Sequence, residues 1–249
     1  MKNYDTYNRE ERNICAHLFR LLHEKKTKSG RLPIQQFIHC IDPTQKIHDF
    51  DNNEIKIFCE VALIRDFYHK IKQNVSDFMN KLTKKIMQQE NINADCRLFS
   101  ELPDELNNPS HTHPKQIKQK AIENGFQLME NEMLVYGVMQ EMFNAKPDLA
   151  IAYDDTLYSI EVKFTESFDV EQFNRTKRIT DVWISLLHEE FGFQNIPKCR
   201  LIKIGARKFN PDVTWSQIFE IAKSTYEEKN RTYIAIAEGA KLLVSKKME

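Results

Sequence analysis

The sequence has few glycines, no long apolar run and no net charge. Its 249 residues include only 6 glycines, and no glycine-rich phosphate-binding loop is present. No apolar stretch approaches the roughly 20 residues that a membrane-spanning helix needs. The start, MKNYDTYNREER, also lacks the apolar core of a signal peptide. Because 36 basic residues balance 36 acidic ones, a protein that coats nucleic acid by charge alone is disfavoured.

The cysteines are odd in number, widely spaced and form no CxxC pair. This pattern favours free thiols in a reducing cytoplasm over a disulfide or zinc framework. The content of 41% apolar and 29% charged residues is typical of a globular domain. We therefore expect a cytoplasmic protein that does not enter a membrane.

The first hundred residues are expected to be helical. Apolar residues recur at helical spacing in residues 14–22, in a helix that Gly30 ends, and again in residues 54–89. A break near Asn74 divides the second run into two helices, and a short helix with Pro33 in its first turn is expected at 32–41. Residues 102–115 are polar and contain three prolines, so they are predicted to form a loop. The predicted organisation is a helical N-terminal region (1–101), a linker (102–115) and a second domain (116–249).

The second half alternates between helices and strands. We expect a helix at 116–143, a β-hairpin at 149–164, a helix at 170–190, a strand at 199–207 and a last strand at 232–237. Another helix is expected to begin at Thr214, where Gln217 completes a capping box and Val213 with Ile218 forms a hydrophobic staple. This order predicts an α/β or α+β fold with a mixed central sheet flanked by helices.

Residues 147–163, PDLAIAYDDTLYSIEVK, carry charged side chains within an apolar hairpin. A two-residue turn at Asp154 and Asp155 places Asp148 opposite Glu161 in the antiparallel register. Because side chains alternate between the two faces of a strand, Lys163 projects from the same face as Glu161. The hairpin therefore predicts two carboxylates and one ammonium on a single face.

Opposed carboxylates destabilise a sheet, and each raises the pKa of the other. A divalent cation turns such a repulsive pair into a pair of ligands, and hard oxygen donors favour Mg²⁺ or Mn²⁺ over zinc. Lys163 can stabilise a phosphate charge or hold an attacking water. The small residues Ala150 and Ala152 are expected to keep this face open. Together these residues indicate phosphodiester hydrolysis by a metal-bound water.

The combination of Pro147-Asp148, a twelve-residue gap and Glu161-Val162-Lys163 on an apolar strand resembles the signature of the PD-(D/E)XK nuclease superfamily. The resemblance covers residues 116–210 and implies the restriction-endonuclease-like fold, with an α-β-β-β-α-β core. It also implies that Asp148 and Glu161 are metal ligands, that the carbonyl of Val162 is a further ligand, and that Lys163 is the catalytic lysine.

The family usually adds an acidic residue from a preceding helix. Glu132 is the first choice and Glu130 the second, while Glu123 and Glu141 are less favoured. The family also commonly has a strand before the one that carries Pro-Asp. Here that strand is expected to be short or to lie in residues 134–139, and the second case favours Glu130 or an earlier glutamate.

A basic segment follows the hairpin. Residues 171–210 hold eight basic side chains against four acidic ones, and phosphate contacts are expected there, with ordinary solvent exposure as the alternative. Some family members carry a glutamine on the helix after the lysine, and Gln172 is the candidate, although it lies closer to Lys163 than expected. The predicted nucleic-acid contacts are Gln172, Arg175, Lys177, Arg178, Arg207 and Lys208.

The sequence thus predicts a Mg²⁺-dependent (or Mn²⁺-dependent) endodeoxyribonuclease. A homodimer is expected, because cutting both strands of a duplex takes two sites. The N-terminal region is expected to supply dimerisation, DNA grip or control by a partner protein. Analogy with the superfamily indicates restriction or antiviral defence. The alternatives are a catalytically inactive nuclease-fold module that binds nucleic acid or a partner, and a nuclease that acts on RNA or branched DNA.

Overall fold

A computed structural model describes residues 11–25, 27–28, 30–43, 55–71, 73–92, 95–164 and 166–248. These residues belong to two compact units. Unit 1 comprises Met1–Val61, Pro147–Asn174 and Pro197–Glu249, and unit 2 comprises Ala62–Lys146 and Arg175–Ile196. One helix, α8 (Val170–Leu187), belongs to both. The predicted linker, residues 102–115, lies inside unit 2, so the boundary between the two units is not in this segment.

Within the described residues, unit 1 is built on a five-stranded mixed sheet. The strands lie in the order β1 (Lys56–Cys59), β2 (Leu149–Tyr153), β3 (Thr156–Val162), β4 (Lys198–Gly205) and β5 (Val213–Thr214). β2 is antiparallel to β1 and to β3, whereas the pairs β3–β4 and β4–β5 are parallel. Parallel neighbours need a long crossover, and the segment that contains α8 connects β3 to β4. The predicted fold class, α/β with a mixed central sheet flanked by helices, is confirmed.

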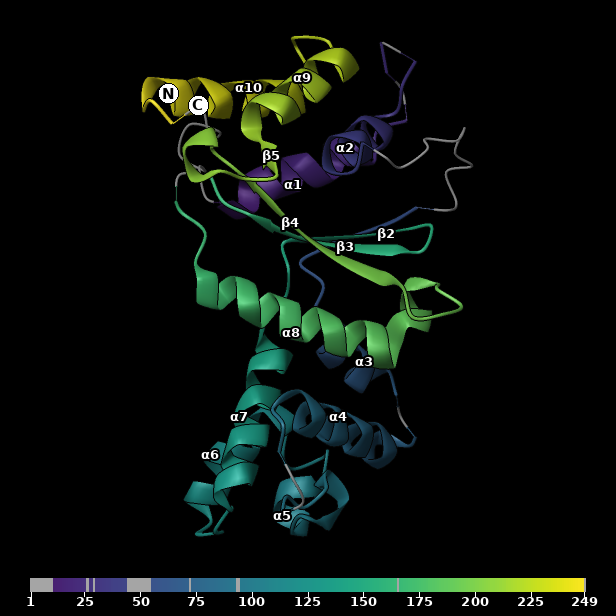
Figure 1. The fold of residues 1–249 in the computed structure, drawn as a ribbon, viewed down its shortest axis with the longest axis vertical. Coiled ribbons are helices and arrows are strands. Elements are labelled where there is room, and N and C mark those ends of the chain that lie inside the picture. Colours follow the sequence, from purple (N-terminus) through teal and green to yellow (C-terminus); the bar gives the residue numbers. More distant parts are fainter. Residues whose placement is uncertain are drawn as a thin grey trace. The chain divides into compact units, whose positions relative to one another are not determined.

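One face of this sheet is covered by α1 (Glu11–Leu22), α2 (Pro33–Ile41), α9 (Trp215–Thr225) and α10 (Arg231–Ser245) (Figure 1). Alternate residues of the central strands share an apolar core with these helices. They are Leu149, Ile151, Tyr153, Tyr158, Ile160, Val162, Ile202 and Ile204. The residues between them face the opposite side of the sheet. The alternation therefore decides which side chains can form a site on that opposite face.

Local sequence signals fix where α9 begins. The hydroxyl of Thr214 accepts the N–H of Gln217 at 3.3 Å, and the Gln217 side chain accepts the N–H of Thr214 at 2.8 Å. Val213 and Ile218 beside this cap are fully buried. The predicted capping box is confirmed, and the burial of both apolar residues agrees with the predicted staple.

Unit 2 is helical in the part that the structure describes. It contains α3 (Leu63–Lys70), α4 (Val75–Gln89), α5 (Asp104–Asn107), α6 (Ile117–Glu123), α7 (Glu130–Asn144) and most of α8, with 3-10 turns at Phe99–Glu101, Pro114–Gln116 and His188–Phe191. Asn74 precedes α4 with a φ of 64°, which confirms the predicted break between two helices. Among the described residues, no helix combines the length and the apolar character that crossing a bilayer requires.

Three predicted elements are wrong. Residues 232–237 lie in α10, because Asn230 accepts the N–H groups of Thr232 and Tyr233 and so begins a helix where a strand was expected. Of the two alternatives for the strand before Pro147, the one that places it in residues 134–139 is wrong, because these residues lie inside α7. Residues 56–59 form β1, where Ile57 pairs with Ile151, although a helix was expected from residue 54, which itself lies outside the described residues. The additional strand is thus contributed by the N-terminal region.

Two helix boundaries also differ from the prediction. The first helix ends at Leu22, well before Gly30. The predicted helix at 116–143 is divided into α6 and α7, because Gly125 follows α6 with a φ of 69°, a conformation that favours glycine.

Candidate active site

The hairpin of β2 and β3 has the predicted register. Leu149 pairs with Ile160, and continuing this register by one residue places Asp148 opposite Glu161. The turn is a tight one in which Asp154 has a φ of 53°, a conformation that aspartate tolerates better than most residues. The two acids that the sequence singled out therefore come from neighbouring strand ends.

Asp148 is anchored at the end of β3 by a backbone hydrogen bond. Its Oδ2 atom accepts the N–H of Val162 at 2.7 Å, and its carbonyl accepts the N–H of Glu60 at 2.9 Å. Because the N–H and C=O of one residue in a strand point the same way, the carbonyl of Val162 points to the same edge of β3 as its N–H. The carbonyl that the resemblance names is therefore on the edge of β3 that the partly buried Asp148 carboxylate binds.

Glu161 and Lys163 form an ion pair on the face opposite the apolar core. The Nζ atom of Lys163 lies 3.4 Å from Oε1 of Glu161, and the two side chains are only 10% and 6% exposed. Gln172, in the first turn of α8, donates a hydrogen bond from its amide to the same Oε1 atom. The structure therefore brings three predicted site residues together, including the glutamine whose spacing was shorter than expected.

The backbone of Lys163 is held on both sides. Its N–H donates to the carbonyl of Ile204 in β4 at 2.8 Å, and its carbonyl accepts the indole N–H of buried Trp215 at 2.9 Å. These two bonds fix the backbone position from which the Lys163 side chain projects.

The expectation that small residues keep this face open is wrong. Ala150 and Ala152 are 0% and 3% exposed, and Ser159 on the paired strand is 1% exposed. Small side chains on a sheet leave room for close packing, so their size alone does not indicate access to solvent. Among the acids of the site, partly buried Asp148 is more accessible than Glu161.

A second lysine on this face was not singled out from the sequence. Lys203 pairs with Glu161 in the parallel register of β3 and β4, so both side chains project from the same side. Its Nζ atom lies 4.3 Å from the ring centroid of Phe173 and 5.6 Å from that of Phe168. In the described part of the chain Lys203 forms no ion pair. Only the register of the parallel pair places it beside Glu161, and the sequence does not give that register.

The ring of Phe168 approaches the backbone of β4 closely. A Cβ atom at Gly205 would lie 3.0 Å from this ring, which is too close for an ordinary contact. Glycine at this position therefore lets Phe168 pack where its ring faces the ammonium of Lys203.

Glu132, the predicted third acid, lies on α7 in unit 2 and has its own partner. Its carboxylate accepts hydrogen bonds from the Arg97 side chain at 2.6 and 2.8 Å, from the Arg97 N–H at 3.0 Å and from the Met129 N–H at 2.9 Å. Burial raises the pKa of Glu132, but these bonds outweigh it, and the pKa lies below its ordinary value. Glu130, the second choice, is exposed in the first turn of the same helix.

The predicted nucleic-acid contacts have different surroundings. Arg178 is ion-paired in unit 2 with Glu90 at 3.1 Å and with Glu141 at 3.6 Å. The other basic residues of the set are exposed: Arg175 and Lys177 on α8, and Arg207 and Lys208 on the 3-10 turn after β4. Exposure makes these four available to a ligand but does not by itself indicate one.

A complete set of metal-binding side chains is not preformed. No group of three or more His, Cys, Asp or Glu side chains in the described residues is arranged to hold a metal ion. The hairpin register offers two carboxylates, Asp148 and Glu161, to such a site. Such a set suits Mg²⁺, which commonly keeps several waters and takes its remaining ligands from phosphate or carbonyl oxygens.

Comparisons of the chain with protein-family models, with curated proteins and with solved structures found no match.

Proposed function

We propose that the protein is a Mg²⁺-dependent nuclease that hydrolyses phosphodiester bonds in DNA. The observations that carry this proposal are the hairpin register, which continued by one residue places Asp148 opposite Glu161, and the ion pair of Glu161 with Lys163 on the face opposite the helical core. The order of the sheet elements along the chain, a helix followed by β1, β2, β3, α8 and β4 with α3–α7 of unit 2 between β1 and β2, supports it further. This order agrees with the α-β-β-β-α-β core of the superfamily that the sequence resembles.

The donor set fits Mg²⁺ or Mn²⁺. In the proposal, the carboxylates of Asp148 and Glu161 and the carbonyl of Val162 hold the ion, and all three supply the hard oxygen atoms that these cations prefer. When bound, the ion supplies a water with a lowered pKa and neutralises phosphate charge. The hydrogen bond from Gln172 fixes the orientation of the Glu161 carboxylate.

The two lysines have distinct tasks in this proposal. Lys163, held beside Glu161, stabilises the negative charge that increases on the reacting phosphate. Lys203, whose ammonium lies against two aromatic rings and forms no ion pair in the described residues, contacts a neighbouring phosphate of the DNA strand. An ammonium that forms no ion pair within the protein is available to a phosphate.

The proposal includes a homodimer in the cytoplasm. Cutting both strands of a duplex takes two sites, which a symmetric dimer provides. All five cysteines are free thiols, as is usual for proteins of a reducing compartment. Restriction or antiviral defence is the role that analogy with the superfamily favours, and control by a partner protein belongs to the same proposal.

A binding module without catalysis is the second candidate, and burial favours it. Glu161 and Lys163 are nearly covered and are satisfied by each other and by Gln172. A carboxylate compensated in this way is stable without a metal ion. Such a module would bind DNA equally well with and without Mg²⁺ and would leave it intact.

Cleavage assays separate these candidates. Linear, circular and single-stranded DNA and RNA are incubated with the parent protein, Asp148→Asn and Lys163→Ala, with and without Mg²⁺. We expect Mg²⁺-dependent cleavage of DNA by the parent and a loss of about 10²-fold or more in each variant. Lys241→Ala, an exposed position on α10, serves as the control and should cut like the parent. Equal cleavage by the parent and both site variants would contradict the proposal.

A further inference from the structure

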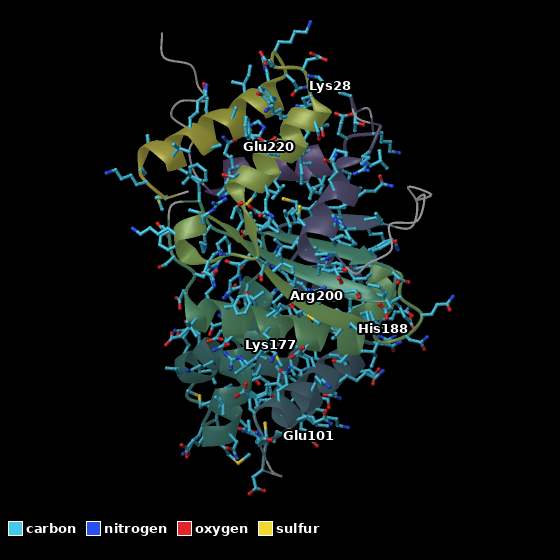
Figure 2. The ribbon with its side chains drawn as sticks, turned by 45° about the horizontal axis from the view of Figure 1, so that its top comes forward. Lys28, Glu101, Lys177, His188, Arg200 and Glu220 are labelled. Carbon is cyan, nitrogen blue, oxygen red and sulfur yellow. The ribbon has the colours of Figure 1, made fainter. Side chains whose placement is uncertain are left out.

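A groove with a volume of about 970 Å³ lies between α2 and α9 in unit 1. These helices cover the core face of the sheet, so the groove is separate from the face that carries Glu161. One wall includes Glu220, which projects from α9 (Figure 2). The polar residues that line the groove include Arg31, Gln36, His39, Arg207, Ser216 and Glu220. Its volume is in the range typical of small-molecule sites.

The charge of the groove favours an anion. Two guanidinium groups, Arg31 and Arg207, and the imidazole of His39 face a single carboxylate, Glu220. That carboxylate lies 4.0 Å from the ammonium of Lys223, which offsets its charge. Within the described residues Arg207 has no ion-pair partner. Guanidinium groups match the geometry of phosphate oxygens and bind them in pairs of hydrogen bonds.

The walls of the groove are fixed before any ligand binds. Phe37 and Ile38 of α2 and Ile218 of α9 are fully buried in the same core. Ser224 of α9 donates to the side chain of Gln36 at 3.1 Å, and Gln36 in turn donates to the carbonyl of Arg31 at 3.3 Å. The loop that carries Arg31 is thereby tied to α9. A preformed site costs less free energy to order when its ligand binds.

The other lining groups indicate more than a bare phosphate. Glu220 is an acceptor among donors, so it suits an amino group or a sugar hydroxyl of the ligand. Ile221 and partly buried Cys40 supply apolar surface in the same groove. The α9 helix also begins here with Ser216 and Gln217 in its first turn, where the helix dipole favours negative charge.

We propose that this groove binds a small phosphate-bearing ligand of the size of a nucleoside phosphate, with Arg31 and Arg207 as its phosphate contacts. Binding does not depend on the nuclease reaction, because the groove and the acidic site lie on different faces of the sheet. The ligand class also assigns Arg207 to a small-molecule site instead of the DNA contact expected from the sequence.

Isothermal titration calorimetry with ATP in the absence of Mg²⁺ tests the proposal. We expect saturable binding to the parent protein, and weakening by about tenfold in Arg207→Ala and in Arg31→Ala, since each removes a charge-assisted contact. Arg207→Lys keeps the charge and should retain more affinity than Arg207→Ala. The matched control Lys241→Ala, also an exposed cation of unit 1, should bind ATP like the parent. Circular dichroism of each variant confirms folding.

Parallel titrations identify the part of the ligand that is recognised and keep this test separate from the nuclease proposal. Inorganic pyrophosphate should bind more weakly than ATP, and adenosine more weakly still. Glu161→Gln should bind ATP like the parent whether or not it cleaves DNA. Absence of ATP binding to the parent would overturn the proposal, and so would equal affinity in Arg207→Ala. Binding of a short DNA duplex that requires Arg207, without binding of ATP, would also overturn it.

Discussion

Each unit contains a buried glutamate beside a cation, and the two sites differ in the groups that surround the carboxylate. In unit 2, both oxygens of Glu132 accept hydrogen bonds from Arg97, and the backbone N–H groups of Arg97 and Met129 complete the set. In unit 1, Oε1 of Glu161 accepts a hydrogen bond from the amide of Gln172 and lies 3.4 Å from the Nζ atom of Lys163. The neighbouring strand end carries a second carboxylate, Asp148.

The difference distinguishes a structural acid from a candidate catalytic acid. A carboxylate with a bidentate guanidinium and two backbone donors has used its acceptor capacity, so it stabilises the fold and has little left for a metal ion. A second carboxylate opposite the first is unfavourable for stability, and a divalent cation between two such groups would offset their repulsion. Burial is the same in both sites and so does not separate them: the side chains of Glu132 and Glu161 are 0% and 6% exposed.

The largest expected effect is on cleavage in Glu161→Gln. The substitution keeps the shape and the contact with Gln172 but removes the charge that would hold the proposed metal ion, so the Mg²⁺-dependent cleavage rate should fall by about 10²–10³-fold. The rate is measured on protein shown to be folded by circular dichroism. A rate within a few-fold of the parent would mean that Glu161 resembles Glu132 in being structural.

For Glu132→Gln we expect a loss of stability without a loss of cleavage. Loss of the charge weakens the bonds to Arg97 and should lower the free energy of unfolding by about 1.5–3 kcal/mol, at the lower end because the Arg97 side chain is 37% exposed. Urea unfolding measures this loss. Cleavage per folded molecule should equal that of the parent. A large loss of cleavage with unchanged stability would instead support the sequence-based expectation that Glu132 joins the acidic site.

The same comparison extends to two basic residues. Lys203 has aromatic neighbours, whereas Arg178 is paired with Glu90 and Glu141. Lys203→Ala should therefore weaken DNA binding and reduce the slope of log affinity against log salt by about 0.9, the value for one phosphate contact. Arg178→Ala should leave the slope unchanged. Fluorescence anisotropy at several salt concentrations measures both, and equal slopes in the parent and Lys203→Ala would remove Lys203 from the DNA contacts.

The smallest effect is on the pH dependence of stability. Because the pKa of Glu132 is lowered in the folded state, its contribution is fully present above the ordinary glutamate pKa of about 4.3 and is lost as the pH falls through the folded value. The difference in unfolding free energy between the parent and Glu132→Gln should thus narrow from pH 7 to pH 3. A difference that is independent of pH would contradict the role of the charge.

The sequence alone predicts the parts of the fold and of the site that depend on near neighbours. The register of the hairpin follows from the alternation and the tight turn at Asp154, and the start of α9 follows from Thr214 and Gln217. Residues 232–237 are rich in residues that favour strands, yet the Asn230 cap makes them helical.

Features that depend on distant partners were not predictable in this way. β1 pairs with β2 across a long stretch of sequence that includes much of unit 2, and no local pattern marks that pairing. Glu132 meets Arg97 through tertiary packing, so its choice as a metal ligand could not be checked from spacing. Lys203 likewise joins Glu161 only through the parallel register.

Isothermal titration calorimetry with Mn²⁺ tests the contrast between the two glutamates most directly. We expect the parent protein and Glu132→Gln to bind the ion with the same affinity, and Glu161→Gln and Asp148→Asn to lose that binding. No binding to the parent, or binding that survives in Glu161→Gln and disappears in Glu132→Gln, would contradict the assignment of the acidic site to the β2–β3 hairpin.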